Sequence, residues 1–155
     1  MGGYAEQLQL LGIVAFAMIL GGLVGLEREA AQKPAGLRTH MLVAGAAALF
    51  VALGSLVART FESPDANGDF RIQTDPVRVI EAVVTGVSFL GAGTIIRSTG
   101  RRIEGLTTAA SLLIAAALGI AVASRQHIVA IGVTLMVLVV LKVVHRMEQR
   151  LRPGG

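Results

Sequence analysis

A line of polar residues crosses the apolar stretch 77–96. Glu81, Thr85 and Ser88 follow one another at intervals of four and three residues, which places them on one face of a helix. Arg78 stands three residues before Glu81, so the two charges can pair on that face. A carboxylate followed by hydroxyls inside a membrane helix is typical of a path for a cation or a proton. The alternative is structural: Glu81 neutralises Arg78, and the hydroxyls bond to their own backbone or to a neighbouring helix.

Two carboxylates, Glu81 and Asp75, are candidate ligands for an inorganic cation. Carboxylate oxygens suit hard cations such as magnesium, although the carboxylates of this chain do not cluster in the sequence as a dedicated cage would. Asp75 is followed by Pro76, which is typical of a helix start with Asp as N-cap and Pro at the first helical position. We therefore predict no cofactor, with magnesium or another inorganic cation as the candidate ligand.

A second group of charges lies in the segment GLEREAAQKPAGLRTH, residues 25–40. Its bases, Arg28 and Arg38 among them, are explained by membrane topology, because Lys and Arg in short loops fix the cytoplasmic side. Acids add little to that rule. Glu27 and Glu29 are therefore candidates for a functional site at the cytoplasmic face.

An internal repeat links this segment to a later one. Residues 22–49 laid on residues 91–118 without a gap pair Arg28 with Arg97 and repeat the pattern Gly-Leu-x-Thr at the same distance. Both hairpins start on the same side of the membrane, so the repeat predicts two parallel hairpins related by an axis along the membrane normal.

The repeated Gly-Leu-x-Thr has a structural and a functional interpretation. Thr39 and Thr108 can cap the helices that follow, by accepting hydrogen bonds from free N–H groups of the first turn. Alternatively, two helix N-termini flanked by Arg form a positive cradle for an anion or for the Glu27 and Glu29 carboxylates.

The elements that position these residues are membrane helices. The 155 residues are 54% hydrophobic and 15% charged, with a mean hydropathy of +0.70, which is a membrane composition. A helix of about twenty residues crosses a hydrocarbon layer of about 30 Å. We predict an all-α bundle in one transmembrane domain, residues 1–155 without a soluble domain, with five spans at about 7–26, 39–58, 77–96, 106–124 and 128–146.

The distribution of Lys and Arg predicts the orientation. Most of these residues fall in 27–38, 97–105 and the region after the fifth span, on one side of the membrane. This places the N-terminus outside and the C-terminus in the cytoplasm. We do not expect the first span to be a cleaved signal peptide, because no basic region precedes it and Glu27-Arg28-Glu29 follows it.

Small residues predict close helix packing. The candidates are Gly21, Gly25, Gly86, Gly91 and Gly93. Such faces suggest a homodimer or a small homo-oligomer, or a membrane-protein partner, in addition to the lipid bilayer.

Several classes of function are excluded or disfavoured. The chain contains no Cys, which excludes disulfides, thiolate catalysis and Cys-ligated zinc. No nucleophile with a base and no glycine-rich phosphate loop is present, and His40, His127 and His145 are isolated and expected at the interfaces, so we predict no enzyme. The bases lie between apolar runs with few aromatic residues, so nucleic acid is not an expected partner.

Three long ordered motifs resemble the membrane domain of a known bacterial family. They are GGLVGLEREAAQKPAGLRTHMLVAGAAALF, DPVRVIEAVVTGVSFLGAGTIIR and GLTTAASLLIAAALG, and they resemble the N-terminal domain of the MgtC/SapB family over about residues 7–148. The family's signature positions correspond to Gly25, Glu27, Arg28, Lys33, Pro34, Gly36, Arg38, Thr39, Asp75, Pro76, Arg78, Gly86, Phe89, Gly91, Gly93, Thr94, Arg97, Gly105, Leu106, Thr107 and Thr108.

The sequence also departs from the family pattern. Ser88 stands where the family usually has Gly, and Leu113 stands where it often has Trp. The soluble C-terminal domain of the longer members is not expected here.

The resemblance implies a multi-pass protein of the bacterial inner membrane, linked to magnesium homeostasis and, in the family, to virulence. Two functions stay open. In one, the protein is a small transporter or channel for an inorganic cation, with Glu81, Thr85 and Ser88 on the path and Glu27 and Asp75 at its mouths. In the other, it is a regulator that transports nothing and binds a partner pump or ATP synthase through glycine-rich helix faces.

Overall fold

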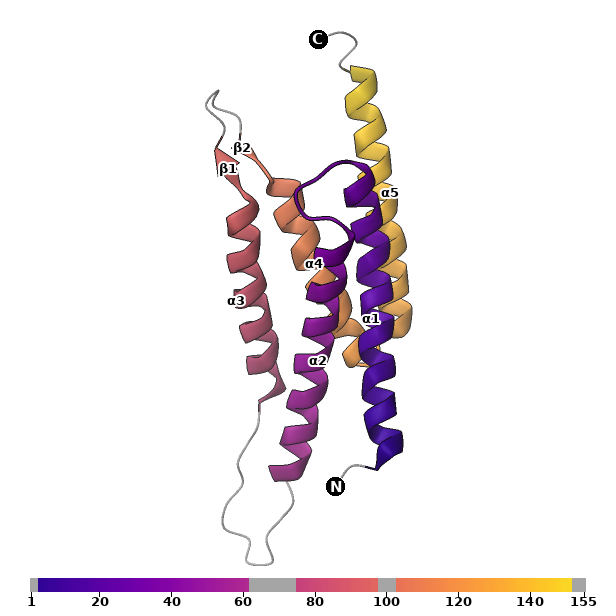
Figure 1. Cartoon of the computed structure of the whole chain (residues 1–155), viewed down its shortest axis with the longest axis vertical. Coiled ribbons are helices and arrows are strands. Elements are labelled where there is room, and N and C mark those ends of the chain that lie inside the picture. Colours follow the sequence, from indigo (N-terminus) through magenta and orange to yellow (C-terminus); the bar gives the residue numbers. More distant parts are fainter. Residues whose placement is uncertain (1–2, 62–74, 98–102, 152–155) are drawn as a thin grey trace, which may run out of the picture.

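The computed structural model describes residues 3–61, 75–97 and 103–151. Its helices are α1 (Tyr4–Ala30), α2 (Leu37–Phe61), α3 (Pro76–Thr94), α4 (Leu106–Ala123) and α5 (His127–Leu151). Two strands of two residues each, β1 (Ile96–Arg97) and β2 (Ile103–Glu104), pair antiparallel between α3 and α4. The predicted all-α bundle of five helices is confirmed (Figure 1).

Within the described residues, four helices are long and apolar enough to cross a membrane. Their spans are Tyr4–Ala30, Leu37–Arg59, Val77–Thr94 and Leu106–Ala123, and Val77–Thr94 is the least hydrophobic of them. The described apolar part of α5, His127–Val143, is shorter. The chain is therefore a multi-pass membrane protein.

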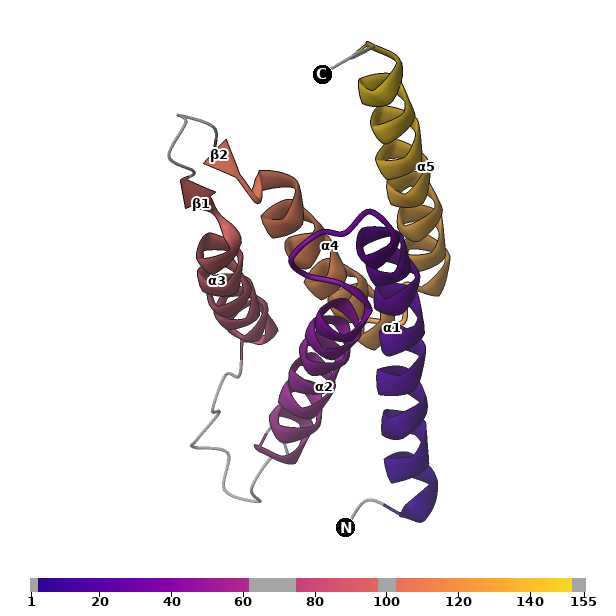
Figure 2. The ribbon, with the colours of Figure 1, turned by 45° about the horizontal axis from the view of Figure 1, so that its top comes forward.

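Three helices form the centre of the bundle. α1 and α2 make an antiparallel hairpin, α4 packs against both, and α5 lies along α1 and α4. α3 lies at one side of the bundle, and its main contacts are with α4 and α2 (Figure 2). We call the end of the bundle that carries residues 31–36 the loop end (Figure 1).

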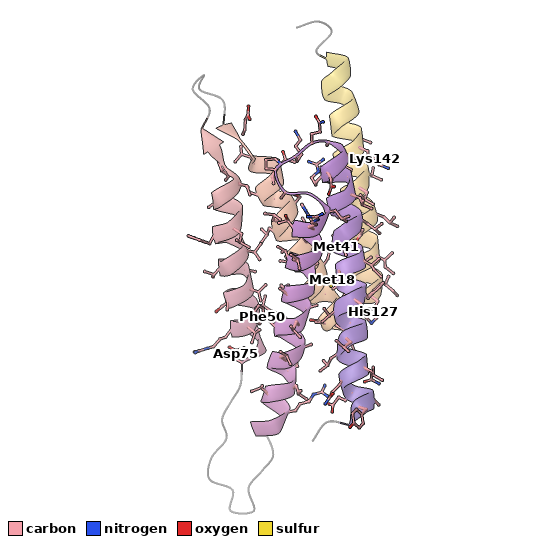
Figure 3. The ribbon with its side chains drawn as sticks, viewed as in Figure 1. Met18, Met41, Phe50, Asp75, His127 and Lys142 are labelled. Carbon is pink, nitrogen blue, oxygen red and sulfur yellow. The ribbon has the colours of Figure 1, made fainter. Side chains whose placement is uncertain are left out.

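Reciprocal contacts between glycine and methionine join α1 to α2. A Cβ atom added to Gly22 on α1 would lie 3.1 Å from Cγ of Met41 on α2. A Cβ added to Gly45 on α2 would lie 2.7 Å from Cγ of Met18 on α1. Both methionines lie along this hairpin (Figure 3). Each missing side chain thus makes room for a flexible one, and the two helices approach closely.

α3 packs more loosely. A groove of about 740 Å³ runs between α2 and α3, and Phe50, Val83 and Leu90 are among its apolar lining residues. Phe50 lies on the side of α2 that faces α3 (Figure 3). Val83 and Val87 are the α3 side chains that enter the core, next to Ala47 and Leu112.

The two hairpins run in the same direction, as a parallel repeat requires (Figure 1). α2 begins at Leu37, directly after Gly36, and α4 begins at Leu106, directly after Gly105. Gly105 has a φ of 92°, a conformation that favours glycine. A Cβ at Gly105 would also collide with the carbonyl oxygen of Thr94.

The predicted capping role of Thr39 and Thr108 is wrong. Both lie inside their helices, because α2 and α4 begin two residues earlier, after the glycine. Gly105 is the N-cap of α4 and makes no side-chain cap bond. At α2, the first N–H group, of Leu37, donates instead to the Glu29 carboxylate at 2.8 Å.

The predicted start of α3 is confirmed. Asp75 is the N-cap, and its carboxylate accepts a hydrogen bond of 2.9 Å from the backbone N–H of Val77. Pro76 occupies the first helical position, where its fixed φ suits the helix and its missing N–H costs no bond. Asp75 lies at the end of α3 that is distant from the loop end (Figure 3).

Candidate functional site

A buried histidine lies at the centre of the polar residues near the loop end. His40, in the first turn of α2, has 0% of its surface exposed. Its Nδ1 atom lies 2.9 Å from the carbonyl oxygen of Gly36, and its Nε2 atom lies 2.9 Å from Oγ of Ser111 on α4. Because a carbonyl only accepts hydrogen bonds, Nδ1 carries a hydrogen and donates it to Gly36. The ring therefore ties α2 to α4.

The hydrogen bonds around Ser111 have two arrangements. Its Oγ lies 2.8 Å from the carbonyl oxygen of Thr108 as well as 2.9 Å from Nε2 of His40. If the hydroxyl donates to Thr108, Nε2 must donate to the hydroxyl, and the ring is a cation. If the hydroxyl donates to Nε2, the ring is neutral and the Thr108 oxygen loses this bond. The positions of the heavy atoms are compatible with either arrangement.

Glycines on α1 make the space for this histidine. A Cβ at Gly25 would lie 2.9 Å from Cβ of His40, and a Cβ at Gly21 would lie 2.6 Å from its carbonyl oxygen. The Gly21-x-x-x-Gly25 face is therefore occupied by α2 of the same chain and is not free for a partner. His40 was expected to be isolated, and this expectation is wrong, because the ring has hydrogen-bond partners at Gly36 and Ser111.

A buried ion pair lies in the last turn of α1. Arg28 is 3% exposed, and its Nε atom donates to Oε2 of Glu27 at 2.6 Å. The terminal nitrogen of the same guanidinium lies 2.5 Å from that oxygen. Arg28 also stands in the last turn of α1, where the helix dipole favours a cation. The two charges are taken out of water together, so each depends on the other.

Glu29 has a structural role. Its Oε2 atom accepts the hydrogen bond from the N–H group of Leu37, and a Cβ at Gly36 would lie 2.9 Å from the same oxygen. The side chain thus reaches across the loop and fixes the start of α2 against the end of α1. Arg38 is exposed on the first turn of α2, and the side chain of Arg97 lies outside the described residues.

The residues proposed for the ion path lie on the outside of α3. Arg78, Glu81, Thr85 and Ser88 are all exposed. The Thr85 hydroxyl donates to the backbone carbonyl of Glu81 at 2.8 Å. Within the described part of the chain, no ion pair joins Arg78 to Glu81, so the predicted pairing is not formed.

The two residues predicted at the mouths of the path lie at opposite ends of the bundle. Glu27 lies at the loop end, and Asp75 caps α3 at the opposite end. Among the residues that the structure describes, no three His, Cys, Asp or Glu side chains come together in a group that could hold a metal ion.

The glycines of α3 differ in their surroundings. A Cβ at Gly91 would lie at an ordinary distance of 3.4 Å from Cβ of Ala109 on α4. A Cβ at Gly86 or Gly93 would have no atom within 4 Å. These two positions are therefore not used for packing inside the chain.

The hydrogen bond between His40 and Ser111 was not predicted from the sequence. A signal for His40 was present, because it is an ionisable residue inside an otherwise uncharged span and follows the repeated turn Gly-Leu-x-Thr. No signal existed for Ser111, since its partner is 71 residues away in the sequence.

Comparison with known proteins agrees with the resemblance. The family model described as the MgtC family matches residues 14–150. An uncharacterized protein of Haemophilus influenzae is 34% identical over 95% of this chain and 63% of its own length. The Escherichia coli K12 protein named "Putative magnesium transporter YhiD" is 38% identical over 87% of this chain and 60% of its own length. Protein MgtC of Salmonella typhimurium is 40% identical over 83% of this chain and 49% of its own length.

No solved structure matches the chain significantly. The chain spans between 49% and 63% of the length of these curated relatives. The match of the family model covers most of the residues, including both the buried cluster at the loop end and the polar face of α3. The chain belongs to the MgtC family.

Proposed function

We propose that this chain serves magnesium homeostasis in the bacterial inner membrane as a regulator of another membrane protein, and that it conducts no ion through its own bundle. The observation that carries the proposal is the composition of the interior. Away from the loop end, the helices enclose mainly apolar side chains such as Ala44, Ala116 and Leu118.

An ion that crosses a bilayer needs polar groups that replace its hydration shell along the way. The buried polar side chains of the described residues are Arg28, His40, Thr108, Ser111 and Thr134. The first four lie near the loop end, and the Thr134 hydroxyl donates to a carbonyl of its own helix. They form no row from one end of the bundle to the other.

The charge at the loop end also disfavours entry of a cation. Arg28 is buried in this region, and a guanidinium has no acceptor atom to offer a cation as a ligand. Its carboxylate partner, Glu27, is already engaged by two nitrogens of the guanidinium.

The link of the proposed function to magnesium comes from the relatives. The Escherichia coli relative is named "Putative magnesium transporter YhiD", and the resemblance to the family implies magnesium homeostasis. This chain spans 60% and 49% of the length of the Escherichia coli and Salmonella relatives, so their role as whole proteins comes to this chain only as part of the proposal.

A second candidate is transport at an interface between copies. The specific observation in its favour is the row of Arg78, Glu81, Thr85 and Ser88 on the outside of α3. A path lined by these residues would need a second polar surface opposite them.

The test is growth and magnesium uptake in two bacterial strains, both without the chromosomal copy of this protein. One strain keeps its magnesium transporters, and the other lacks them. A regulator changes growth at low magnesium in the first strain and gives no uptake in the second. Uptake restored by this chain alone in the second strain would contradict the proposal and favour transport.

A further inference from the structure

The polar face of α3 is a straight line along the helix. Arg78, Glu81, Thr85, Ser88 and Ala92 are separated alternately by three and four residues, the spacing of a seam between two helices. All five are exposed. We call these five residues the α3 seam.

The opposite face of α3 is the one that the chain itself uses. Val83, Val87 and Gly91 are buried against α2 and α4. From Glu81 to Ala92 the α3 seam therefore points away from the rest of the bundle, which agrees with the position of α3 at one side (Figure 2), whereas Arg78 at its start also lines the groove between α2 and α3.

Such a face cannot lie stably against lipid. α3 is one of the helices that are apolar and long enough to cross the membrane. Arg78 is close to the start of the helix, and its long side chain can extend to the interface. Glu81 is short and lies a further turn inside, where a lone carboxylate is costly and calls for a polar or cationic neighbour.

We propose that the α3 seam binds the α3 seam of a second copy of this chain. All copies enter the membrane in the same orientation, so a two-fold axis that relates two of them runs along the membrane normal. The two α3 helices are then parallel. Three residues of helix rise about 4.5 Å, so Arg78 of each copy comes within reach of Glu81 of the other.

A second copy is favoured over another protein by charge complementarity. The α3 seam carries one cation and one anion at adjacent positions, so a parallel pair neutralises both charges with two reciprocal bridges. Thr85, Ser88 and Ala92 continue the seam with small side chains, which allow close approach of two helices. This inference does not depend on the proposed regulatory function, because it concerns assembly alone.

The first test uses charge reversal in two differently tagged copies. Arg78→Glu leaves two acids in the α3 seam, and Glu81→Arg leaves two bases. Each variant alone should show at least a ten-fold lower dimer fraction in mild detergent than the unchanged chain. Co-expressed, the two variants complement each other, and the mixed dimer should recover on purification through both tags. Dimers of unchanged amount in both single variants would overturn the proposal.

A second test does not require charge reversal and uses the absence of Cys in the chain. Thr85→Cys in native membranes should give a disulfide-linked dimer under mild oxidation. Val139→Cys on α5, which is exposed in the same way, is the matched control and should give none. A protein in which Thr85→Cys links to a different membrane protein, or in which Val139→Cys links as well as Thr85→Cys, would contradict the α3 seam as a contact between copies.

Discussion

The loop end of the bundle and the outer face of α3 contain the same kinds of residue, but Arg28 and His40 at the loop end are buried, whereas the polar side chains on the outer face of α3 are exposed. Each combines an Arg and a Glu with hydroxyl side chains and nearby glycines. At the loop end, α1 has glycines against α2, so His40 fits between the helices and Arg28 is buried with Glu27. On α3, a Cβ added to Gly86 would have no atom within 4 Å, and Glu81 is exposed.

The comparison shows what a polar pattern in a membrane helix can and cannot reveal. Spacing identifies which residues share a face. Which way that face points depends on where small side chains let a neighbouring helix approach closely. The loop end is therefore expected to contribute to the stability of a single chain, and the α3 seam only to assembly.

The largest effect is expected from separating the buried ion pair. Glu27→Gln leaves the Arg28 guanidinium buried without its carboxylate, and we expect a loss of about 3 kcal/mol in the free energy of unfolding. Unfolding in mixed micelles of SDS and a mild detergent measures this loss. The double variant Glu27→Gln, Arg28→Met should lose less than the single variant. A single variant as stable as the unchanged chain would show that the pair is hydrated.

A somewhat smaller effect is expected at the contact of α1 with α2. Gly21→Ala places a Cβ 2.6 Å from the carbonyl oxygen of His40 and from Cβ of Ala44, so the helices must separate. We expect a loss of about 2 kcal/mol. Gly132→Ala on α5, where a Cβ has no atom within 4 Å, is the control and should not lower stability. Equal unfolding curves for the two variants would refute the close contact.

The buried hydrogen bond should have a moderate effect. Ser111→Ala removes the side-chain partner of Nε2 of His40 and should cost about 1 to 2 kcal/mol, the penalty for an unpaired buried polar atom. Thr134→Val is the control, since that hydroxyl bonds to a carbonyl of its own helix. A Thr134→Val variant less stable than Ser111→Ala would contradict the larger contribution of the hydrogen bond between His40 and Ser111.

The smallest effect is expected on the α3 seam. Thr85→Val removes an exposed hydroxyl that donates to the carbonyl of Glu81, and the unfolding of monomeric chains in detergent should change by less than about 0.5 kcal/mol. A loss as large as that of Ser111→Ala would mean that α3 turns this face toward its own bundle.

Much of the fold was predictable because it follows from local signals. The apolar runs predicted the five helices, and Asp75-Pro76 predicted the start of α3, since caps and helix-starting prolines act within a few residues. The repeated Gly-Leu-x-Thr was recognised, but its role was misassigned. The glycine already ends the loop, so Thr39 and Thr108 fall inside their helices.

The site was less predictable because it depends on contacts between distant segments. Arg28 and Glu27 were named from the sequence, and they do pair. His40 and Ser111 were not recognised as partners, because nothing in either segment indicates the other. Glu29 was a site candidate, and its bond to Leu37 depends on the path of the loop between α1 and α2.

The measurement that tests the central claim most directly is magnesium flux into liposomes that contain only the purified chain and a magnesium-sensitive dye. The account predicts the same influx as in liposomes without protein, because apolar side chains fill the interior beyond the loop end. An ionophore added at the end verifies the dye. Influx that depends on the protein, disappears in Glu81→Gln and persists in Thr134→Val would contradict the account and assign conduction to the face of α3.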